Sequence, residues 1–208
     1  MLKAKIAVLV SGSGTNLQAL IDAQNSGKLN SGEIVLVISG TEGAYALTRA
    51  EKAGIRAETV AYKKCSSQQE FEEKIRKLLD EAGIDLIIMA GFLNILTADF
   101  TRRYPDRIIN IHPSLIPSFC GKGFYGLKVH EAALAYGVKV TGATVHFVNE
   151  IPDGGRILMQ KAVAVEDGDT AEVLQKRVME QAEWIILPAA AEKVCKSIVD
   201  APNKIELE

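Results

Sequence analysis

Residues 6–16 read IAVLVSGSGTN and set the fold class. An apolar, mostly β-branched run, a glycine-rich turn and the start of an amphipathic pattern form the strand–turn–helix opening of an α/β unit. The same alternation continues, with Gly27, Gly54 and Gly83 placed where helices would stop. It predicts strands at residues 6–10, 34–38, 57–60, 86–89 and 108–111, and helices at residues 16–26, 44–53, 68–82 and 98–103. Such alternation gives a parallel sheet with helices on both faces.

The pattern changes after Pro117. A helix is expected at residues 127–136, then two long alternating runs at residues 139–148 and 156–165, and a closing helix at residues 170–199 that would bend at Pro188. The paired runs favour an antiparallel extension at one edge of the sheet. We therefore predict an open, Rossmann-like three-layer α/β sandwich, mostly parallel, with antiparallel strands at the carboxy-terminal edge. Neither a repeat nor a linker divides the sequence, so residues 1–208 are expected to form a single domain.

The composition fits a small enzyme that works in the cytoplasm. The 208 residues are 48% hydrophobic and 24% charged, enough for one good core, and the net charge of -2 argues against a general nucleic-acid binder. Cys65, Cys120 and Cys195 form no CxxC pair, so neither a disulfide framework nor a zinc site is indicated. The first apolar run is far shorter than a signal-peptide core or a membrane span. We expect neither export nor a membrane partner.

Three loops are the places to look for a site, because ligands of open α/β sheets bind at the carboxyl ends of the strands, near the point where the strand order reverses. They are residues 11–16, 90–94 and 110–117. The first, SGSGTN, lacks the third glycine of a dinucleotide loop and the lysine of a Walker loop. It is either a tight turn in which Thr15 caps the following helix, or a cradle for a monophosphate. The cradle residues would be Ser13, Gly14, Thr15 and Asn16.

The loop after the fifth expected strand carries the chemistry. Residues 110–117 read NIHPSLIP, and an Asp-Gly-Gly turn at residues 153–155 lies further along the chain. Asn110 and His112 project to the same side of an extended strand. With Asp153, they supply an amide, an imidazole and a carboxylate, which can hold a carbonyl, stabilise a tetrahedral oxyanion and move protons, as acyl transfer requires. The alternatives are a hydrogen-bonded loop histidine and an aspartate that only forms its turn.

The remaining candidate residues do not gather into a catalytic or metal-binding pattern. His130 and His146 fall on an expected helix and strand, where a structural or rim position is the simpler interpretation. Ser114 lacks the Gly-x-Ser-x-Gly elbow of a serine nucleophile, and Cys120 lacks a local nucleophile signature. The sequence has no His, Cys or carboxylate cluster at metal-ligand spacing, so we expect no metal.

Taken together, these motifs resemble those of one family. They are SGSGTNLQ at residues 11–18, AGF at 90–92, NIHPSLIP at 110–117, HFV at 146–148 and DGG at 153–155. From Lys5 to about Ala191, the chain resembles the folate-dependent phosphoribosylglycinamide formyltransferases. The Asn-x-His and Asp-Gly-Gly pair is shared by the wider formyltransferase superfamily. The amino-terminal glycine loop and the compact length point to this branch, and to a single formyltransferase domain.

The resemblance implies a reaction and a set of roles. 10-Formyltetrahydrofolate would donate its formyl group to the amine of glycinamide ribonucleotide in purine biosynthesis. Asn110 would bind the formyl oxygen, His112 would stabilise the oxyanion, and Asp153 would pair with His112 and assist proton movement. Because a nearby carboxylate raises the pKa of a histidine, we expect a cationic His112. The resemblance assigns the acceptor phosphate to Ser13, Gly14, Thr15 and Asn16, the ribose to Glu183, and the folate pocket to Gln68, Phe92, Leu93, Asn94, Ile95, Leu96, Val148 and Ile151.

The sequence departs from the family pattern at three places. Residues 118–126 (SFCGKGFYG) make a loop several residues longer than usual, which is either a lid on the site or a surface variation. Asn94 and Gln68 stand where many members have arginines near the folate tail. The charge for the glutamate carboxylates would then come from Lys63, Lys64 or Lys122.

Other functions are compatible with parts of the pattern. A methionyl-tRNA formyltransferase would need a carboxy-terminal tRNA-binding domain, and a formyltetrahydrofolate deformylase would need an amino-terminal regulatory domain; the extent of this sequence leads us to expect neither. A non-catalytic nucleotide-binding module would use the glycine loop alone, which leaves the combination of Asn110, His112 and Asp153 unexplained. Monomer and homodimer are both open.

Overall fold

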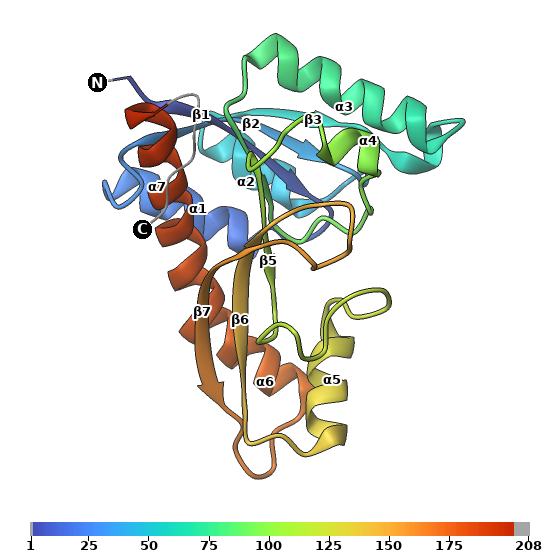
Figure 1. The fold of residues 1–208 in the computed structure, drawn as a ribbon, viewed down its shortest axis with the longest axis vertical. Coiled ribbons are helices and arrows are strands. Elements are labelled where there is room, and N and C mark those ends of the chain that lie inside the picture. The colour runs from blue at the N-terminus through green and yellow to red at the C-terminus, as the bar shows by residue number, and fades with distance from the viewer. Residues whose placement is uncertain (1, 202–208) are drawn as a thin grey trace.

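The computed structural model describes residues 2–201, and within them seven strands form one sheet. The strand order is β3-β2-β1-β4-β5-β6-β7 (Figure 1). The strands are β1 (Ala4–Val10), β2 (Gly32–Ser39), β3 (Arg56–Thr59), β4 (Leu86–Met89), β5 (Ile108–His112), β6 (Val140–Phe147) and β7 (Ile157–Ala164). β1 to β5 run parallel, whereas β6 pairs antiparallel with both β5 and β7.

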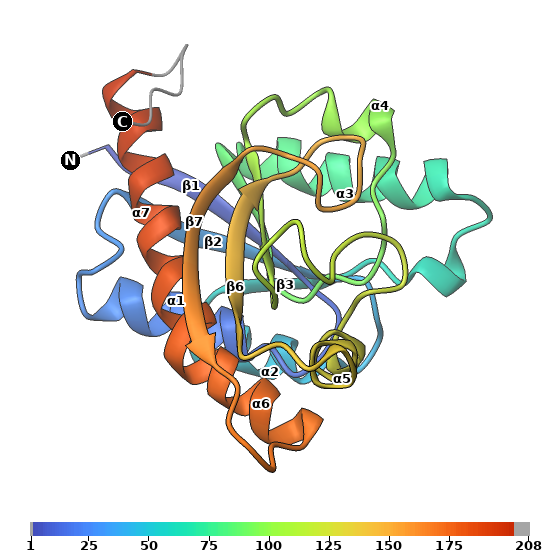
Figure 2. The same ribbon diagram turned by 60° about the horizontal axis from the view of Figure 1, so that its bottom comes forward.

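Helices pack on both faces of this sheet (Figure 2). They are α1 (Thr15–Asn25), α2 (Tyr45–Lys52), α3 (Gln68–Ala82), α4 (Ala98–Thr101), α5 (Leu127–Tyr136), α6 (Ala171–Val178) and α7 (Trp184–Asp200), with a 3-10 turn at Tyr62–Lys64 and a π-helical turn at Met179–Glu183. Buried residues of α1, α2, α6 and α7, among them Leu20, Ala46 and Leu187, form one core cluster with the sheet. Phe71 and Phe100, of α3 and α4, belong to a second cluster. The predicted three-layer α/β fold is confirmed.

The expected elements are present, with their ends shifted by no more than a few residues, but two local expectations are wrong. Thr15 does not cap α1, because Gly14 is the N-cap residue and no side chain caps the helix. The closing helix is not continuous over residues 170–199, since the turn Met179–Glu183 divides it into α6 and α7. Pro188 lies inside α7, and the widened turn immediately precedes the segment where its missing N–H and its ring disturb regular helix bonding.

The strand order explains where the expected site loops meet. β2 and β4 flank β1 on opposite sides, so the direction of winding reverses between β1 and β4. The loops after β1, β4 and β5 therefore leave the sheet at neighbouring positions of one edge. The Leu93 amide donates to the Ser11 hydroxyl at 3.0 Å and joins the first two of these loops. The loop after β6 folds back over β5 and brings Asp153 to His112.

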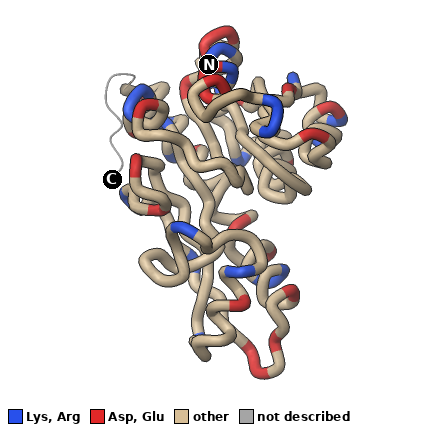
Figure 3. The backbone as a smooth tube through the Cα atoms, turned by 90° about the vertical axis from the view of Figure 1, so that its right-hand side faces the viewer, with Lys and Arg blue, Asp and Glu red and all other residues tan. Residues whose placement is uncertain are grey.

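Lysine and arginine are interspersed with aspartate and glutamate along the chain (Figure 3), in keeping with the net charge of -2. Cys65, Cys120 and Cys195 are free thiols. Over residues 2–201, no helix combines the length and the apolar character that crossing a bilayer requires.

Candidate active site

Asn110 and His112 lie on β5, and both face the same side because side chains alternate along a strand. The antiparallel register of β6 sets His146 directly opposite Asn110. The Asn110 amide nitrogen lies 3.1 Å from Nε2 of His146. Nδ1 of His146 lies 2.7 Å from the carbonyl oxygen of Phe147 and donates to it, which leaves Nε2 to accept one N–H of Asn110. The second N–H of that amide has no partner among residues 2–201.

His112 is 4% exposed and contacts two oxygen atoms. Its Nε2 lies 2.9 Å from the carbonyl oxygen of Phe119, which can only accept, so Nε2 carries a proton. Its Nδ1 faces Oδ2 of Asp153 at 3.6 Å. Oδ1 of the same carboxylate lies 3.6 Å from Nε2 of His146. The Asp153 carboxylate therefore stands between two buried imidazole rings.

Asp153 is held in place by the backbone around it. Its φ is 56°, in the left-handed region that aspartate tolerates better than most residues. The turn requires Gly155, because a Cβ there would lie 1.8 Å from the carbonyl oxygen of Phe147. Burial acts to raise the pKa of Asp153, but the neighbouring His146 ring, the charge that His112 carries at acidic pH and the hydrogen bond from the Gly121 amide outweigh it, and the pKa lies below its ordinary value. Asp153 is an anion at neutral pH.

The expected rise in the pKa of His112 is wrong. Burial disfavours the imidazolium and lowers the pKa; Asp153 and the Phe119 carbonyl act in the opposite direction without reversing the shift. At pH 7, His112 is therefore mainly neutral, with its proton on Nε2 and a lone pair on Nδ1 that faces Asp153. A ring in this state can take up a proton, and the neighbouring carboxylate stabilises the cation that forms.

The long loop at residues 118–126 is part of this site. The Phe119 carbonyl accepts from His112, and the Gly121 amide donates to Oδ2 of Asp153 at 2.7 Å. Phe119 has a φ of 49°, which a bulky side chain rarely adopts. The loop thus contacts both catalytic candidates, which favours a role at the site over a surface variation.

The glycine loop lies at the amino end of α1 and meets Glu183. Gly14 has a φ of 73°, and a Cβ on it would lie 2.7 Å from Cβ of Ala46. Nδ2 of Asn16 donates to Oε2 of Glu183 at 2.6 Å, whereas Oδ1 of Asn16 is buried without a hydrogen-bond partner among the described residues. Burial raises the pKa of Glu183 to about 7, against the effect of Asn16. The residues predicted for phosphate and ribose are therefore in direct contact.

The residues predicted for the folate pocket divide into a buried and an exposed set. Phe92 and Leu96 are buried in the second core cluster, and the Phe92 ring stacks on Phe71. Leu93, Ile95 and Ile151 are instead exposed by 63%, 60% and 59%. Val148 packs against the core, and its amide donates to the carbonyl of Ile108 at 2.9 Å. A Cβ on Gly40 would lie 2.6 Å from Oδ1 of Asn94, so Asn94 closely approaches β2.

Helix α3 holds the loop that carries these residues. Gln68 donates to the Ile95 carbonyl at 3.0 Å, so its side chain supports the loop backbone. Glu72 accepts from the amide of Thr97 at 2.7 Å and from its hydroxyl at 2.6 Å. Lys64, one of the lysines expected to serve the folate tail, pairs with Glu42. Helix α3 therefore anchors this loop through the Ile95 carbonyl and through Thr97.

For His146 we expected only a structural or rim position, and for Glu72 we expected no role at the site. His146 is 1% exposed and contacts both Asn110 and Asp153, and its place before the Asp153 turn was the signal for this. Glu72 gave no signal, since it looks like any charged helix residue. His130 is fully buried in α5; neither ring nitrogen has a partner in the described part of the chain, and burial lowers its pKa to about 4. Within residues 2–201, no group of three or more His, Cys, Asp or Glu side chains could hold a metal ion.

A sheet that presents an amide, an imidazole and an ionised carboxylate at the ends of its central strands, with a glycine-rich loop after β1, has the features of an α/β acyl-transfer enzyme. The chain belongs to the formyl transferase family, whose model matches residues 4–190.

Within this family, the chain is similar to phosphoribosylglycinamide formyltransferases. The Haemophilus influenzae enzyme of that name is 42% identical over 184 residues, which make up 88% of this chain and 84% of that protein. The trifunctional purine biosynthetic protein adenosine-3 of Homo sapiens is 44% identical over 197 residues, 95% of this chain; the match spans only 19% of that protein. The structure of glycinamide ribonucleotide transformylase 1 from Symbiobacterium toebii matches with a TM-score of 0.87 and 39% identity, over 93% of this chain and 88% of that one.

Proposed function

We propose that this chain transfers the formyl group of 10-formyltetrahydrofolate to the amine of glycinamide ribonucleotide, a step of purine biosynthesis. The observation that carries the proposal is the convergence of Asn110, His112 and Asp153 beside a glycine loop suited to a phosphate. The names of its relatives support the same reaction, and membership of the formyl transferase family supports a folate-type donor.

Asn110 binds the formyl oxygen. The acceptor amine attacks the formyl carbon, and the carbonyl oxygen becomes an oxyanion. Asn110 uses one N–H for His146 and donates the other to this oxygen. His146 is a positioning residue here, because the Phe147 carbonyl fixes its ring and the ring in turn orients the amide.

His112 supplies a second hydrogen bond and, with Asp153, moves the proton. In the structure its Nε2–H donates a hydrogen bond to the Phe119 carbonyl, so residues 118–126 release that bond and act as a lid when substrates enter. The pair takes up the proton that the amine loses, and Asp153 stabilises the imidazolium. When the tetrahedral intermediate collapses, the bond from the formyl carbon to the folate nitrogen breaks and that nitrogen receives the proton.

The glycine loop and Glu183 bind the acceptor. Amides at the start of a helix favour an anion, and the unused Oδ1 of Asn16 can accept a hydrogen bond from the ligand. Because its pKa is raised to about 7, Glu183 is neutral in a large share of molecules, which limits its repulsion of the phosphate while it contacts the ribose. Ser13, Gly14 and Thr15 complete this cradle.

The folate lies against the loops after β4 and β6. The exposed apolar side chains of Leu93, Ile95 and Ile151 suit a flat aromatic ring, and the buried residues behind them hold the loops in place. Lys63 and Lys122 are the remaining lysines that can serve the glutamate carboxylates. Phe92, Asn94, Leu96, Gln68 and Val148 form or support the same pocket.

The proposal treats residues 1–208 as a single formyltransferase domain that acts in the cytoplasm as a monomer or homodimer, without a metal. Three free thiols support a reducing compartment. The net charge of -2 supports small-molecule substrates over nucleic acid.

A formyl-transfer assay tests the reaction. Purified protein is given 10-formyltetrahydrofolate with and without glycinamide ribonucleotide, and formylated product and free formate are both measured. We expect acceptor-dependent product, and His112→Ala should lower the rate by about two orders of magnitude or more. His112→Gln is the matched variant, since it keeps a donor for the Phe119 carbonyl but lacks the imidazole. Full turnover in both variants would remove His112 from the mechanism.

The same assay separates the alternatives. Formate release without acceptor would identify a formyltetrahydrofolate deformylase. Binding of the acceptor without turnover of either kind would identify a non-catalytic nucleotide-binding module. An acceptor analogue without the phosphate should bind much more weakly in calorimetry, and equal affinities would refute the phosphate role of residues 13–16.

A further inference from the structure

Helix α2 binds the glycine loop through two hydrogen bonds to loop carbonyls. The Ala46 amide donates to the carbonyl of Gly12 at 3.1 Å, and Nε of Arg49 donates to the carbonyl of Ser13 at 2.9 Å. Two successive carbonyls of the loop are therefore bound by the same helix. The close approach of Ala46 to Gly14 brings the helix near enough for both bonds.

These two bonds set the direction of the loop amides. In a trans peptide, the C=O and the N–H point in opposite directions. A Gly12 carbonyl that points toward α2 turns the Ser13 N–H away from it, and a Ser13 carbonyl that points toward α2 does the same for Gly14. Neither amide donates to another group within residues 2–201. Both are thus presented on the side of the loop where an anion would bind.

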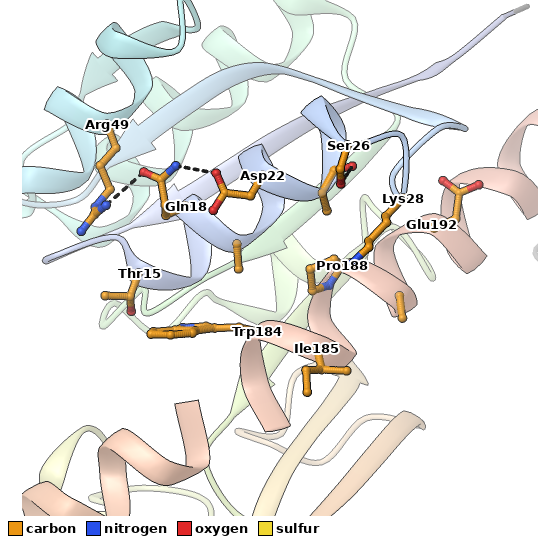
Figure 4. Close-up of a pocket in the computed structure, with 13 residues that line it drawn as sticks. Thr15, Gln18, Asp22, Ser26, Lys28, Arg49, Trp184, Ile185, Pro188 and Glu192 are labelled. Atoms are coloured by element: carbon orange, nitrogen blue, oxygen red, sulfur yellow. Dashed lines mark hydrogen bonds between the residues drawn. The ribbon is translucent and has the colours of Figure 1, made fainter. Parts of the chain in front are cut away.

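The Arg49 guanidinium is itself fixed by three neighbours. Besides the bond to Ser13, it donates from a terminal nitrogen to Oε1 of Gln18 at 3.0 Å, and it lies 5.0 Å from the centre of the Tyr45 ring. Gln18 in turn donates to Asp22 at 2.9 Å, and Figure 4 shows this chain of side chains running from α2 along α1. A guanidinium held this firmly at the loop places a positive charge beside the amides.

We infer that Arg49 is a positioning residue for the acceptor's phosphate: it holds the Ser13 carbonyl so that the Gly14 amide faces the phosphate, and its charge stabilises the bound dianion. The inference rests on the proposed function, because the phosphate is that of the proposed acceptor. Arg49 is half-buried and bonds to the Ser13 carbonyl and to Gln18 instead of to Asn110, His112 or Asp153, so its contribution is to affinity and not to the chemical step.

Steady-state kinetics of Arg49→Met tests this, because methionine keeps most of the side-chain volume and loses the charge and the donors. We expect KM for glycinamide ribonucleotide to rise about tenfold or more, with kcat changed by less than about threefold. With glycinamide riboside, which lacks the phosphate, the variant should match the wild type. Arg49→Lys, which keeps the charge without the planar fork, should recover part of the loss.

Arg56→Met is the matched control, since Arg56 is an exposed arginine of β3 whose partners are Glu58 and Glu81. An unchanged KM in Arg49→Met, or an equal loss with both acceptors, would overturn the inference. If Arg49→Met folds poorly in thermal melts, Arg49→Gln takes its place, with the same expectations.

Calorimetry with inorganic phosphate separates this inference from the proposed function. Binding by the wild type that weakens in Arg49→Met supports the inference even if the protein formylates nothing. Formylation by the wild type with equal phosphate affinity in both proteins would refute the inference and leave the proposed function standing.

Discussion

Glu183→Gln is predicted to stabilise the protein at pH 8 relative to the wild type. Glu183 is 6% exposed, and burial raises its pKa from 4.5 to about 7. Below pH 4.5 the carboxyl is protonated in both the folded and the unfolded chain and makes no difference. Between pH 4.5 and about 7 the unfolded chain ionises first and binds fewer protons, so the free energy of unfolding falls as the pH rises. Glutamine stays neutral and removes this loss.

The change in pKa from 4.5 to about 7 corresponds to about 3 kcal/mol in the free energy of unfolding. Glutamine also keeps an acceptor for Nδ2 of Asn16, so the contact itself is preserved. We therefore expect the free energy of unfolding of the variant, minus that of the wild type, to grow by about 3 kcal/mol from pH 4.5 to pH 8.

Urea denaturation at several pH values measures this difference, with the fluorescence of Trp184, the single tryptophan, as the probe. The buffers should contain no phosphate, which would bind the folded state. Glu180→Gln is the matched control: it makes the same change in charge on the same π-helical turn, at an exposed side chain. Parallel stability curves for the wild type and Glu183→Gln would refute the reasoning.

Three further outcomes are expected. Asp153→Asn should lower kcat by about two orders of magnitude or more with little change in KM, because the neutral amide no longer stabilises the His112 imidazolium; a kcat near that of the wild type would contradict this. Gly155→Ala should lower both kcat and the melting temperature, because its Cβ would lie 1.8 Å from the Phe147 carbonyl oxygen, and a variant equal to the wild type in melting scans and turnover would show that the turn can shift freely. Dialysis against EDTA should leave the rate unchanged; loss of activity that zinc or magnesium restores would end the metal-free mechanism.

The course of the chain was predictable because its signals are local. α3, β4 and α5 begin and end at the residues that the sequence pattern predicts. β-Branched runs and glycine stops act over only a few residues, so they can be read from the sequence. The edge hairpin was predictable for the same reason. The π-helical turn at Met179–Glu183 was not, because a proline inside a helix predicts a disturbance near Pro188 but does not tell which preceding residues take it up.

Some features of the candidate site likewise follow from local sequence, and others depend on the tertiary structure. Asn110 and His112 are two residues apart on one strand, so their common direction follows from strand geometry alone. The partnership of Asn110 with His146 depends on the register between β5 and β6, and the contacts of Phe119 and Arg49 depend on where a loop and a helix come to rest. These contacts join segments far apart in the sequence, so no local pattern of residues signals them.

By itself, the sequence determined the strand and helix order, the three loops that meet at one edge of the sheet and the side chains able to perform acyl transfer, because residue type and spacing act locally. Only the tertiary structure decided the ionisation of those side chains. Asp153 alone would raise the pKa of His112, yet burial lowers it, and burial likewise raises the pKa of Glu183. Desolvation depends on all the atoms packed around a group, and these come from many segments, so no single stretch of sequence predicts it.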